Sequence, residues 1–229
     1  MALRFSFGDA RTPGWIRLQR AIGLGPLSLF AVYHLWQNWP ALEGREAWTA
    51  RAHPSALGRG LGISVLALLA VHAAVGVVRW ARQRGTAPSQ APGQDAAHGA
   101  GRARFQVVTG ALLLVFVVYH VLQVWPAGAS AAHAAAYDGY ELMWQRMGRP
   151  LHLLCYVLGT AALAFHLGHG WARSFEAKPG HGVRMSVRYV AGIAGLLLFV
   201  LYIQLVGRFA LGEAVVPLEK AEVQLGPGE

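Results

Sequence analysis

The sequence predicts an all-α integral membrane protein built as a bundle of five transmembrane helices. Hydrophobic residues make up 55% of the 229-residue chain and charged residues only 14%, whereas an average soluble domain has about 25% charged residues. Five windows lack Asp, Glu, Lys and Arg: 21–42, 60–78, 105–137, 150–172 and 189–207. Each can supply the roughly 20 residues that cross a bilayer as a helix. We therefore predict one membrane domain over residues 1–229, with transmembrane helices near 18–39, 59–80, 104–125, 149–172 and 187–208.

Local signals set the limits of the third helix. Its window is longer than one span, and we expect the helix to end near Trp125–Pro126 because proline interrupts helical hydrogen bonding. The connection before it, residues 82–104, is rich in Gly, Ala, Pro and Gln, which is typical of a loop.

Basic residues indicate the orientation and argue against one class of function. With the N-terminus in the cytoplasm, 13 Lys and Arg residues fall on the inner side of the membrane and seven on the outer side, as the positive-inside rule requires. The net charge of +9 is spread between the apolar blocks, and no nucleic-acid-binding motif is visible. The sequence thus predicts a multi-pass protein with a cytoplasmic N-terminus and no nucleic-acid partner.

An internal repeat relates the helices in pairs. The first and third helices share the pattern F-x-V-Y-H-x-x-Q-x-W-P, which places His34 and His120 at equivalent positions. The second and fourth share L-A-x-H-x3-G-x2-R, which places His72 and His166 at equivalent positions. Since the paired helices run in the same direction, His34 and His120 share one depth and His72 and His166 another. The two levels are about 10–15 Å apart at 1.5 Å per residue.

Four matched histidines inside apolar helices indicate a function. A buried His with unpaired nitrogen atoms costs about 1–3 kcal/mol, and ionisable residues within spanning helices are usually functional. Two histidines at one depth on different helices can bind a haem iron from both faces, and an iron ligated in this way transfers electrons. The pairs His34 with His120 and His72 with His166 therefore predict two haem groups enclosed by the first four helices.

Other interpretations of these residues stay open. The histidines could form hydrogen bonds between helices, whereas zinc would need four converging ligands. His169 is a rival ligand to His166, although the repeat aligns His166 with His72. Arg79 and Arg173, with Arg17 and Arg20 as further candidates, could bind haem propionates or could simply anchor the inner surface. Small residues could give room for a porphyrin or for ordinary helix packing: Gly76, Gly110, Gly159, Gly168 and Gly170.

Two segments resemble a known family, the dihaem cytochrome b subunits of succinate:quinone oxidoreductases. Residues 165–175, FHLGHGWARSF, are similar to its block that begins F-H-x-x-[NH]-G and ends S-F, in which the second His position can be Asn; this favours His166 as the ligand. Residues 23–34 are similar to its G-x-x-P-L block before a His. The likeness covers about residues 15–208 and is greatest to the Bacillus-type cytochrome b558 subunit, alongside the epsilonproteobacterial fumarate reductase subunit.

The resemblance implies a function and a set of partners. It implies two haem b groups, an outer one held by His34 and His120 and an inner one held by His72 and His166. It also implies a membrane quinone (menaquinone or ubiquinone) as substrate, with a flavoprotein subunit and an iron–sulfur subunit on the cytoplasmic face of the bacterial inner membrane. The chain would be the quinone-reactive electron-transfer subunit of a succinate dehydrogenase or fumarate reductase, with dicarboxylate chemistry on a partner. A higher oligomer of the complex is compatible with this assignment.

The quinone site and the alternatives are less determined by the sequence. The resemblance implies a quinone site near the outer haem with an acidic residue; Glu43 and Glu46 are candidates, and each is equally a solvated loop acid. No catalytic residue is assigned. One rival is a dihaem cytochrome b of a hydrogenase, formate dehydrogenase or nitrate reductase. The other is a haem-free membrane transporter or assembly protein.

Overall fold

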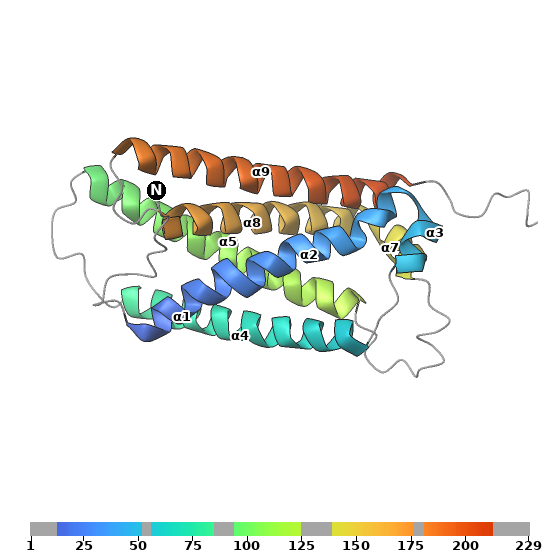
Figure 1. The fold of residues 1–229 in the computed structure, drawn as a ribbon, viewed down its shortest axis with the longest axis horizontal. Coiled ribbons are helices and arrows are strands. Elements are labelled where there is room, and N and C mark those ends of the chain that lie inside the picture. Colours follow the sequence, from blue (N-terminus) through green and yellow to red (C-terminus); the bar gives the residue numbers. More distant parts are fainter. Residues whose placement is uncertain (1–12, 52–55, 85–93, 125–138, 176–180, 213–229) are drawn as a thin grey trace, which may run out of the picture.

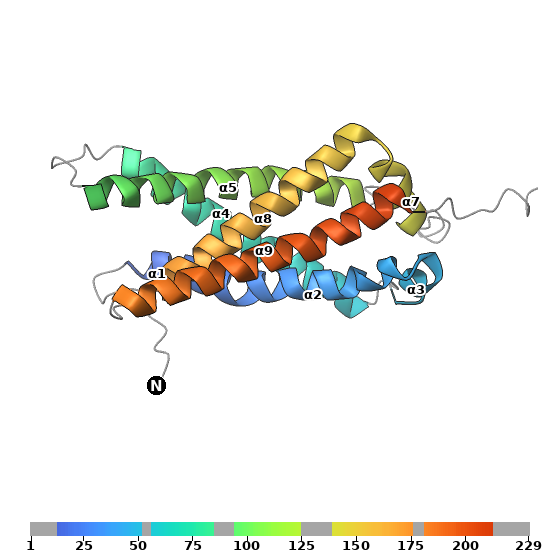
Figure 2. The ribbon, with the colours of Figure 1, turned by 90° about the horizontal axis from the view of Figure 1, so that it is seen from above.

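All regular elements are helices in the computed structural model, which describes residues 13–51, 56–84, 94–124, 139–175 and 181–212. The long helices lie along one axis of the molecule, and each runs opposite to the one before it (Figure 1). A second view shows α8 running from the α1–α2 side to the α5 side, while α4 runs behind it in the opposite sense, from the α5 side to the α2 side (Figure 2). The prediction of an all-α protein is confirmed.

The expected helices appear with changed boundaries. The first is divided into α1 (Gly14–Ile22), the π-helical turn η1 (Gly23–Leu27) and α2 (Ser28–Asn38), followed by the 3-10 turn η2 (Trp39–Leu42) and the short α3 (Arg45–Arg51). The others are α4 (Ala56–Arg84), α5 (Gln94–Val124), α8 (Pro150–Phe175) and α9 (His181–Leu211), with the short α7 (Gly139–Met147) before α8. Because α5 begins at Gln94, the predicted loop over residues 82–104 was wrong in its second half; Trp125 and Pro126 lie outside the described residues.

Four helices have the length and hydropathy of a membrane span, so the chain is a multi-pass membrane protein. The four spans are Gly60–Arg82, Arg104–Val124, Pro150–Ser174 and Ser186–Leu211. The first expected span is not one helix of this kind because the π turn divides it. Its three parts nevertheless follow one another without a break from Gly14 to Asn38, a length of about 37 Å at 1.5 Å per residue.

Proline accounts for the π turn. Pro26 lies inside the turn and has no N–H to offer the carbonyl of Ile22 four residues earlier, whereas a π turn forms its hydrogen bonds to the fifth residue instead. Side chains then hold the turn against α8. Ser28 Oγ donates to the Gly23 carbonyl at 2.6 Å, and Trp171 Nε1 donates to Ser28 Oγ at 3.0 Å.

Small residues bring α8 and α9 into close contact. A Cβ built on Gly168 would lie 3.1 Å from the Ala191 carbonyl oxygen, and one built on Gly195 would lie 2.9 Å from the Ala164 carbonyl oxygen. Each helix thus contributes an A-x3-G pair to the crossing, as is common between membrane helices. Of the two uses considered for Gly168, the structure shows helix packing.

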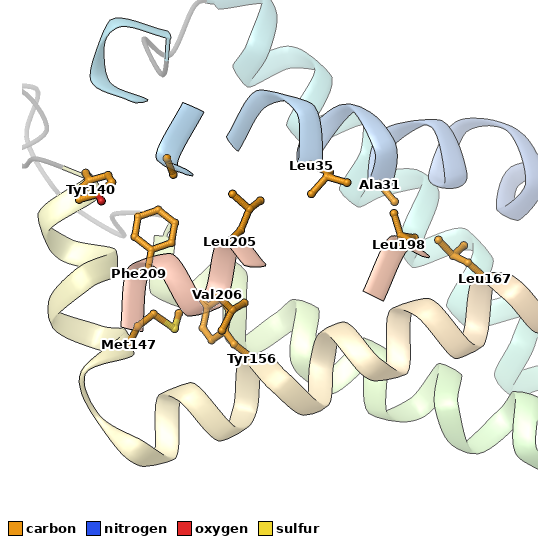
Figure 3. Packing of buried hydrophobic residues seen from close by; sticks show 11 residues of the cluster. Ala31, Leu35, Tyr140, Met147, Tyr156, Leu167, Leu198, Leu205, Val206 and Phe209 are labelled. Carbon is orange, nitrogen blue, oxygen red and sulfur yellow. The ribbon is translucent and has the colours of Figure 1, made fainter. Parts of the chain in front are cut away.

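The buried core lies on one side of the bundle. Apolar side chains from α2, α7, α8 and α9 pack together, as Leu35, Met147, Tyr156 and Leu205 illustrate (Figure 3). In contrast, α4 has no buried side chain among its described residues, and the only buried one in the described part of α5 is Thr109. The helices that bear His72 and His120 are therefore packed loosely by the protein itself.

Candidate haem-binding site

The structure brings the imidazole rings of each expected histidine pair together. The ring centroids of His34 and His120 lie 5.9 Å apart, with an angle of 81° between the planes. Those of His72 and His166 lie 6.2 Å apart at 82°. All four side chains are half-buried. The two pairs are thus alike in separation and in ring angle, although they involve four different helical segments.

These separations suit a metal ion between two imidazoles. With metal–nitrogen bonds of about 2 Å, two rings that bind one iron from opposite faces place their centres about 6 Å apart. Across the described residues, no group of three or more His, Cys, Asp or Glu side chains converges. The donor set therefore fits two bis-histidine irons, and it does not fit the four-ligand zinc site considered above.

The pair His34 and His120 lies among aromatic side chains. Phe30 stacks on His34 at 5.4 Å and 22°, and its repeat partner Phe116 packs on His120 at 5.8 Å and 31°. Tyr156 Oη, from α8, lies 3.0 Å from His120 Nδ1. The same hydroxyl lies 4.0 Å from the Met143 sulfur. When the Tyr156 oxygen accepts from His120 Nδ1–H, Nε2 of His120 is left to bind a metal.

A backbone carbonyl orients His72. His72 Nδ1 lies 3.0 Å from the carbonyl oxygen of Gln19, and since a carbonyl can only accept, Nδ1 carries the proton and Nε2 keeps its lone pair. The ring packs against a glycine, because a Cβ built on Gly23 would lie 2.9 Å from His72 Cε1. A metal-binding His commonly donates its second N–H in this way, which fixes the ring.

His166, on α8, packs against α5 in the way that His72 packs against η1. A Cβ built on Gly110 would lie 2.9 Å from His166 Cε1, the same distance as at Gly23. His166 Nδ1 lies 3.2 Å from Gln106 Nε2 and 3.5 Å from Thr109 Oγ1. When Nε2 binds a metal and Nδ1 carries the proton, the Thr109 hydroxyl is the acceptor within reach. His169, the rival ligand, instead packs against Phe105 at 5.9 Å, so the residue that faces His72 is His166.

The glutamines reveal a part of the repeat that the sequence analysis missed. The pattern R-x-Q-x3-G occurs at residues 17–23 and again at 104–110, so Gln19 and Gln106 are 87 residues apart. His34 and His120 are 86 residues apart. The first copy therefore has one additional residue between its Gln and its His, and the π turn lies in that interval. A π turn accommodates one extra residue in a helix. Gln19 and His34 can therefore take the same relative positions as Gln106 and His120.

Three arginines gather at the end of the bundle nearer to His72 and His166. Arg20, Arg79 and Arg173, from α1, α4 and α8, are close enough to repel one another electrostatically. Among the described residues no carboxylate forms an ion pair with them. Like charges converge at a cost unless an anion is shared between them, so this cluster is suited to carboxylate groups of a ligand. Arg79 and Arg173 were expected here, and Arg20 was a further candidate from the sequence; the structure brings these three together.

The remaining glycines and candidate acids have separate roles. Gly159 accommodates the Phe116 ring, because a Cβ there would overlap that ring. Gly76 and Gly170 face Gln19 and Gln106, with Cβ distances of 3.1 and 3.7 Å to the respective Nε2 atoms. The candidate quinone-site acids lie at the other end of the bundle, Glu43 after η2 and Glu46 in the first turn of α3.

A comparison with known proteins extends this geometry. No family model matches the chain, and no solved structure matches it. Over 190 residues the chain is 28% identical to the succinate dehydrogenase cytochrome b558 subunit of Bacillus subtilis (strain 168), an alignment that covers 80% of this chain and 88% of that protein. The two proteins are homologues. The resemblance to Bacillus-type cytochrome b558 subunits, first drawn from residues 23–34 and 165–175, is thereby confirmed.

Proposed function

We propose that the chain is the dihaem cytochrome b membrane subunit of a succinate dehydrogenase or fumarate reductase. In this role it passes electrons between an iron–sulfur subunit and a membrane quinone. The observation that supports this most is the pair of opposed imidazole sites, with ring separations of 5.9 and 6.2 Å. Homology to a succinate dehydrogenase cytochrome b558 subunit supports the same role.

Each haem b would take two axial histidines. His72 and His166 would hold the inner group and His34 and His120 the outer one, while Arg79 and Arg173, with Arg20, would pair the inner propionates through charge-assisted hydrogen bonds. Haem b supplies reversible one-electron chemistry when it is bound. Because two histidines would hold each group, oxygen and other small ligands would be excluded from the iron.

The histidine contacts prepare the rings for this role. The Gln19 carbonyl holds the proton of His72 on Nδ1, and the Tyr156 hydroxyl would do the same for His120, so that Nε2 of each ring is left as an acceptor. The stacked Phe30 and Phe116 restrict rotation of the outer pair. These contacts reduce the reorganisation that accompanies ligand binding and electron transfer.

The topology follows from the proposal. The continuous segment Gly14–Asn38 would be a fifth membrane crossing, since its length of about 37 Å exceeds the ~30 Å hydrocarbon core. With the N-terminus in the cytoplasm, the arginine cluster would face the side on which the flavoprotein and iron–sulfur subunits dock. The site of quinone reaction would then lie toward the opposite surface, with dicarboxylate chemistry on the partner.

Haem stoichiometry of the purified chain tests this proposal. We expect two haem b per wild-type chain and two in His169→Ala. His34→Ala and His120→Ala should each keep only the inner haem, whereas His72→Ala and His166→Ala should each keep only the outer haem. The pyridine haemochrome assay gives the number, and reduced-minus-oxidised spectra distinguish the two groups. In membranes that contain the whole complex, succinate should reduce both haems. A chain without a b-type spectrum would contradict the proposal, and two haems in His166→Ala with one in His169→Ala would change the ligand assignment.

A further inference from the structure

Two glutamines make the same contact at equivalent places in the repeat. Gln19 Nε2 donates to the backbone carbonyl of His72 at 3.3 Å, and Gln106 Nε2 donates to the backbone carbonyl of His166 at 3.2 Å. Each bond joins neighbouring helical segments, α1 to α4 and α5 to α8. A carbonyl oxygen has two lone pairs and can accept a second hydrogen bond in addition to the one within its helix. Each amide therefore ties the helical turn that bears an inner histidine to the facing helix.

The two helices of each pair interlock through glycines. The imidazole of His72 occupies the space beside Gly23 of η1, while the amide of Gln19 occupies the space beside Gly76 of α4. His166 and Gln106 occupy the spaces beside Gly110 and Gly170 in the same manner. A polar side chain of one helix thus enters a gap left by a glycine of the other, in both directions and at both copies.

The amides keep these positions although part of each is left unpaired. Gln19 Oε1 and Gln106 Oε1 are both buried and have no hydrogen-bond partner among the described residues. An unpaired buried acceptor destabilises a fold, and the same cost occurs at both copies of the repeat. Stability alone would favour an apolar side chain of similar shape at these two positions.

We infer that Gln19 and Gln106 are positioning residues that fix the two inner histidines through their backbone carbonyls, so that the imidazole planes stay nearly perpendicular and opposed. The inference rests on the proposed function, since it assumes that His72 and His166 bind haem. The amide does not touch the metal, and it acts by setting the rotation and height of the turn that carries the ligand. The Gln106 amide also lies 3.2 Å from Nδ1 and 3.4 Å from Nε2 of His166; with Nδ1 protonated and Nε2 bound to iron, it keeps only its bond to the His166 carbonyl.

Methionine substitutions separate the hydrogen bond from the packing. Gln19→Met and Gln106→Met keep nearly the same shape and lose the N–H donor. The low-spin EPR signal of ferric haem depends on the angle between the axial imidazole planes, which is 82° here. We expect both variants to lower the largest g-value of the inner haem and to shift its midpoint potential, with two haems retained. Gln37→Met is the matched control, because Gln37 donates to Tyr33 Oη on the exposed face of α2.

Single-haem backgrounds assign the signals. Measured in His34→Ala, which should keep only the inner haem, the Met substitutions should change the EPR signal; measured in His72→Ala, which should keep only the outer haem, they should not. An unchanged inner signal, or equal changes in both backgrounds, would overturn the inference and leave the proposed function standing. A wild-type chain without haem would contradict the proposed function and the inference together.

The glycines supply a second, independent variant. Gly76→Ala places a Cβ 3.1 Å from Gln19 Nε2 and should displace the amide, whereas Gly170→Ala places one at an ordinary contact distance of 3.7 Å from Gln106 Nε2. We expect the first to reproduce the spectrum of Gln19→Met and the second to match wild type. The reverse order of effects would overturn the inference.

Discussion

The two histidine levels are built in different ways. At the inner level both rings pack against a glycine at the same distance, and both histidine carbonyls accept from a glutamine, so the two halves of the site repeat each other. At the outer level both rings pack on a phenylalanine, but among the described residues only His120 has a polar partner for Nδ1, the phenol of Tyr156. The repeat thus gives both inner histidines the same surroundings. The two outer histidines differ, because only His120 contacts Tyr156 of α8.

The difference indicates how each site responds to change. The inner histidines depend on backbone positions and on helix register, since the Gln19 carbonyl and two glycines hold them. The outer histidines depend on side chains that can be replaced individually. A deletion that shifts the helix register should therefore have the largest effect, a loss of bound haem. Removal of a positive charge should lower the midpoint potential of the inner haem. Removal of the Tyr156 hydroxyl should change only the midpoint potential of the outer haem.

The largest effect is expected from single-residue deletions. Deleting Leu112 from α5 turns Gln106 and Gly110 by about 100° relative to His120, so the two levels can no longer both align and at least one haem is lost. Deleting Pro26 removes the additional residue of the first copy, which converts the π turn into an α-helical turn while Gln19 and His34 keep their relative places. We expect two haems per chain in the Pro26 deletion, as measured by the pyridine haemochrome assay.

The paired deletions test the role of the π turn. Leu112 is exposed on its helix, so loss of a buried contact would not explain the effect of its removal. Equal haem loss in both deletions would show that the π turn does more than absorb one residue. Two haems in the Leu112 deletion would show that helix register does not determine the site.

Charge at the arginine cluster should separate the potentials of the two haems. Arg79→Gln removes one of three converging positive charges, and positive charge favours the reduced, more negative state of a nearby haem. We expect the inner midpoint potential to fall by on the order of 50 mV, as for a unit charge about 10 Å away in a medium of intermediate dielectric constant. Redox titration of the α-band measures it. Arg51→Gln, at the far end beside Trp36, is the control, and a larger fall of the outer potential would contradict the assignment of levels.

Much of the fold could be read from the sequence because apolar composition and the positions of histidines are local properties. Charge-free windows predicted the long helices, and the F-x-V-Y-H repeat predicted that His34 would meet His120. The division of the first helix was missed, since its signal is a difference of one residue between two repeats. That signal appears only when Gln19 and Gln106 are aligned as well as the histidines.

Other features depend on tertiary structure and could not be predicted from single helices. Gly168 and Gly170 are two residues apart, yet one packs on α9 and the other admits Gln106, because successive positions on a helix face different neighbours. The sequence offered Arg20 as a candidate, but its convergence with Arg79 and Arg173 depends on how the ends of three helices are placed. The early start of α5 was missed because composition alone does not exclude a helix in an Ala-rich connection.

The smallest expected effect concerns Tyr156 and tests the outer level directly. Tyr156 is buried, and its hydroxyl lies 3.0 Å from His120 Nδ1. When His120 binds iron through Nε2, Nδ1–H donates to this hydroxyl, which makes the imidazole a stronger donor to iron and favours the oxidised state. Tyr156→Phe removes about 1 kcal/mol of hydrogen bonding, so the outer midpoint potential should rise by about 40 mV at most while the inner one stays unchanged. Tyr119→Phe is the matched control, because its ring packs on Tyr156 at 6.3 Å without that bond. Since a rise in the inner potential alone would mean that Tyr156 serves the other haem, one redox titration of the two variants decides whether His120 belongs to the outer site.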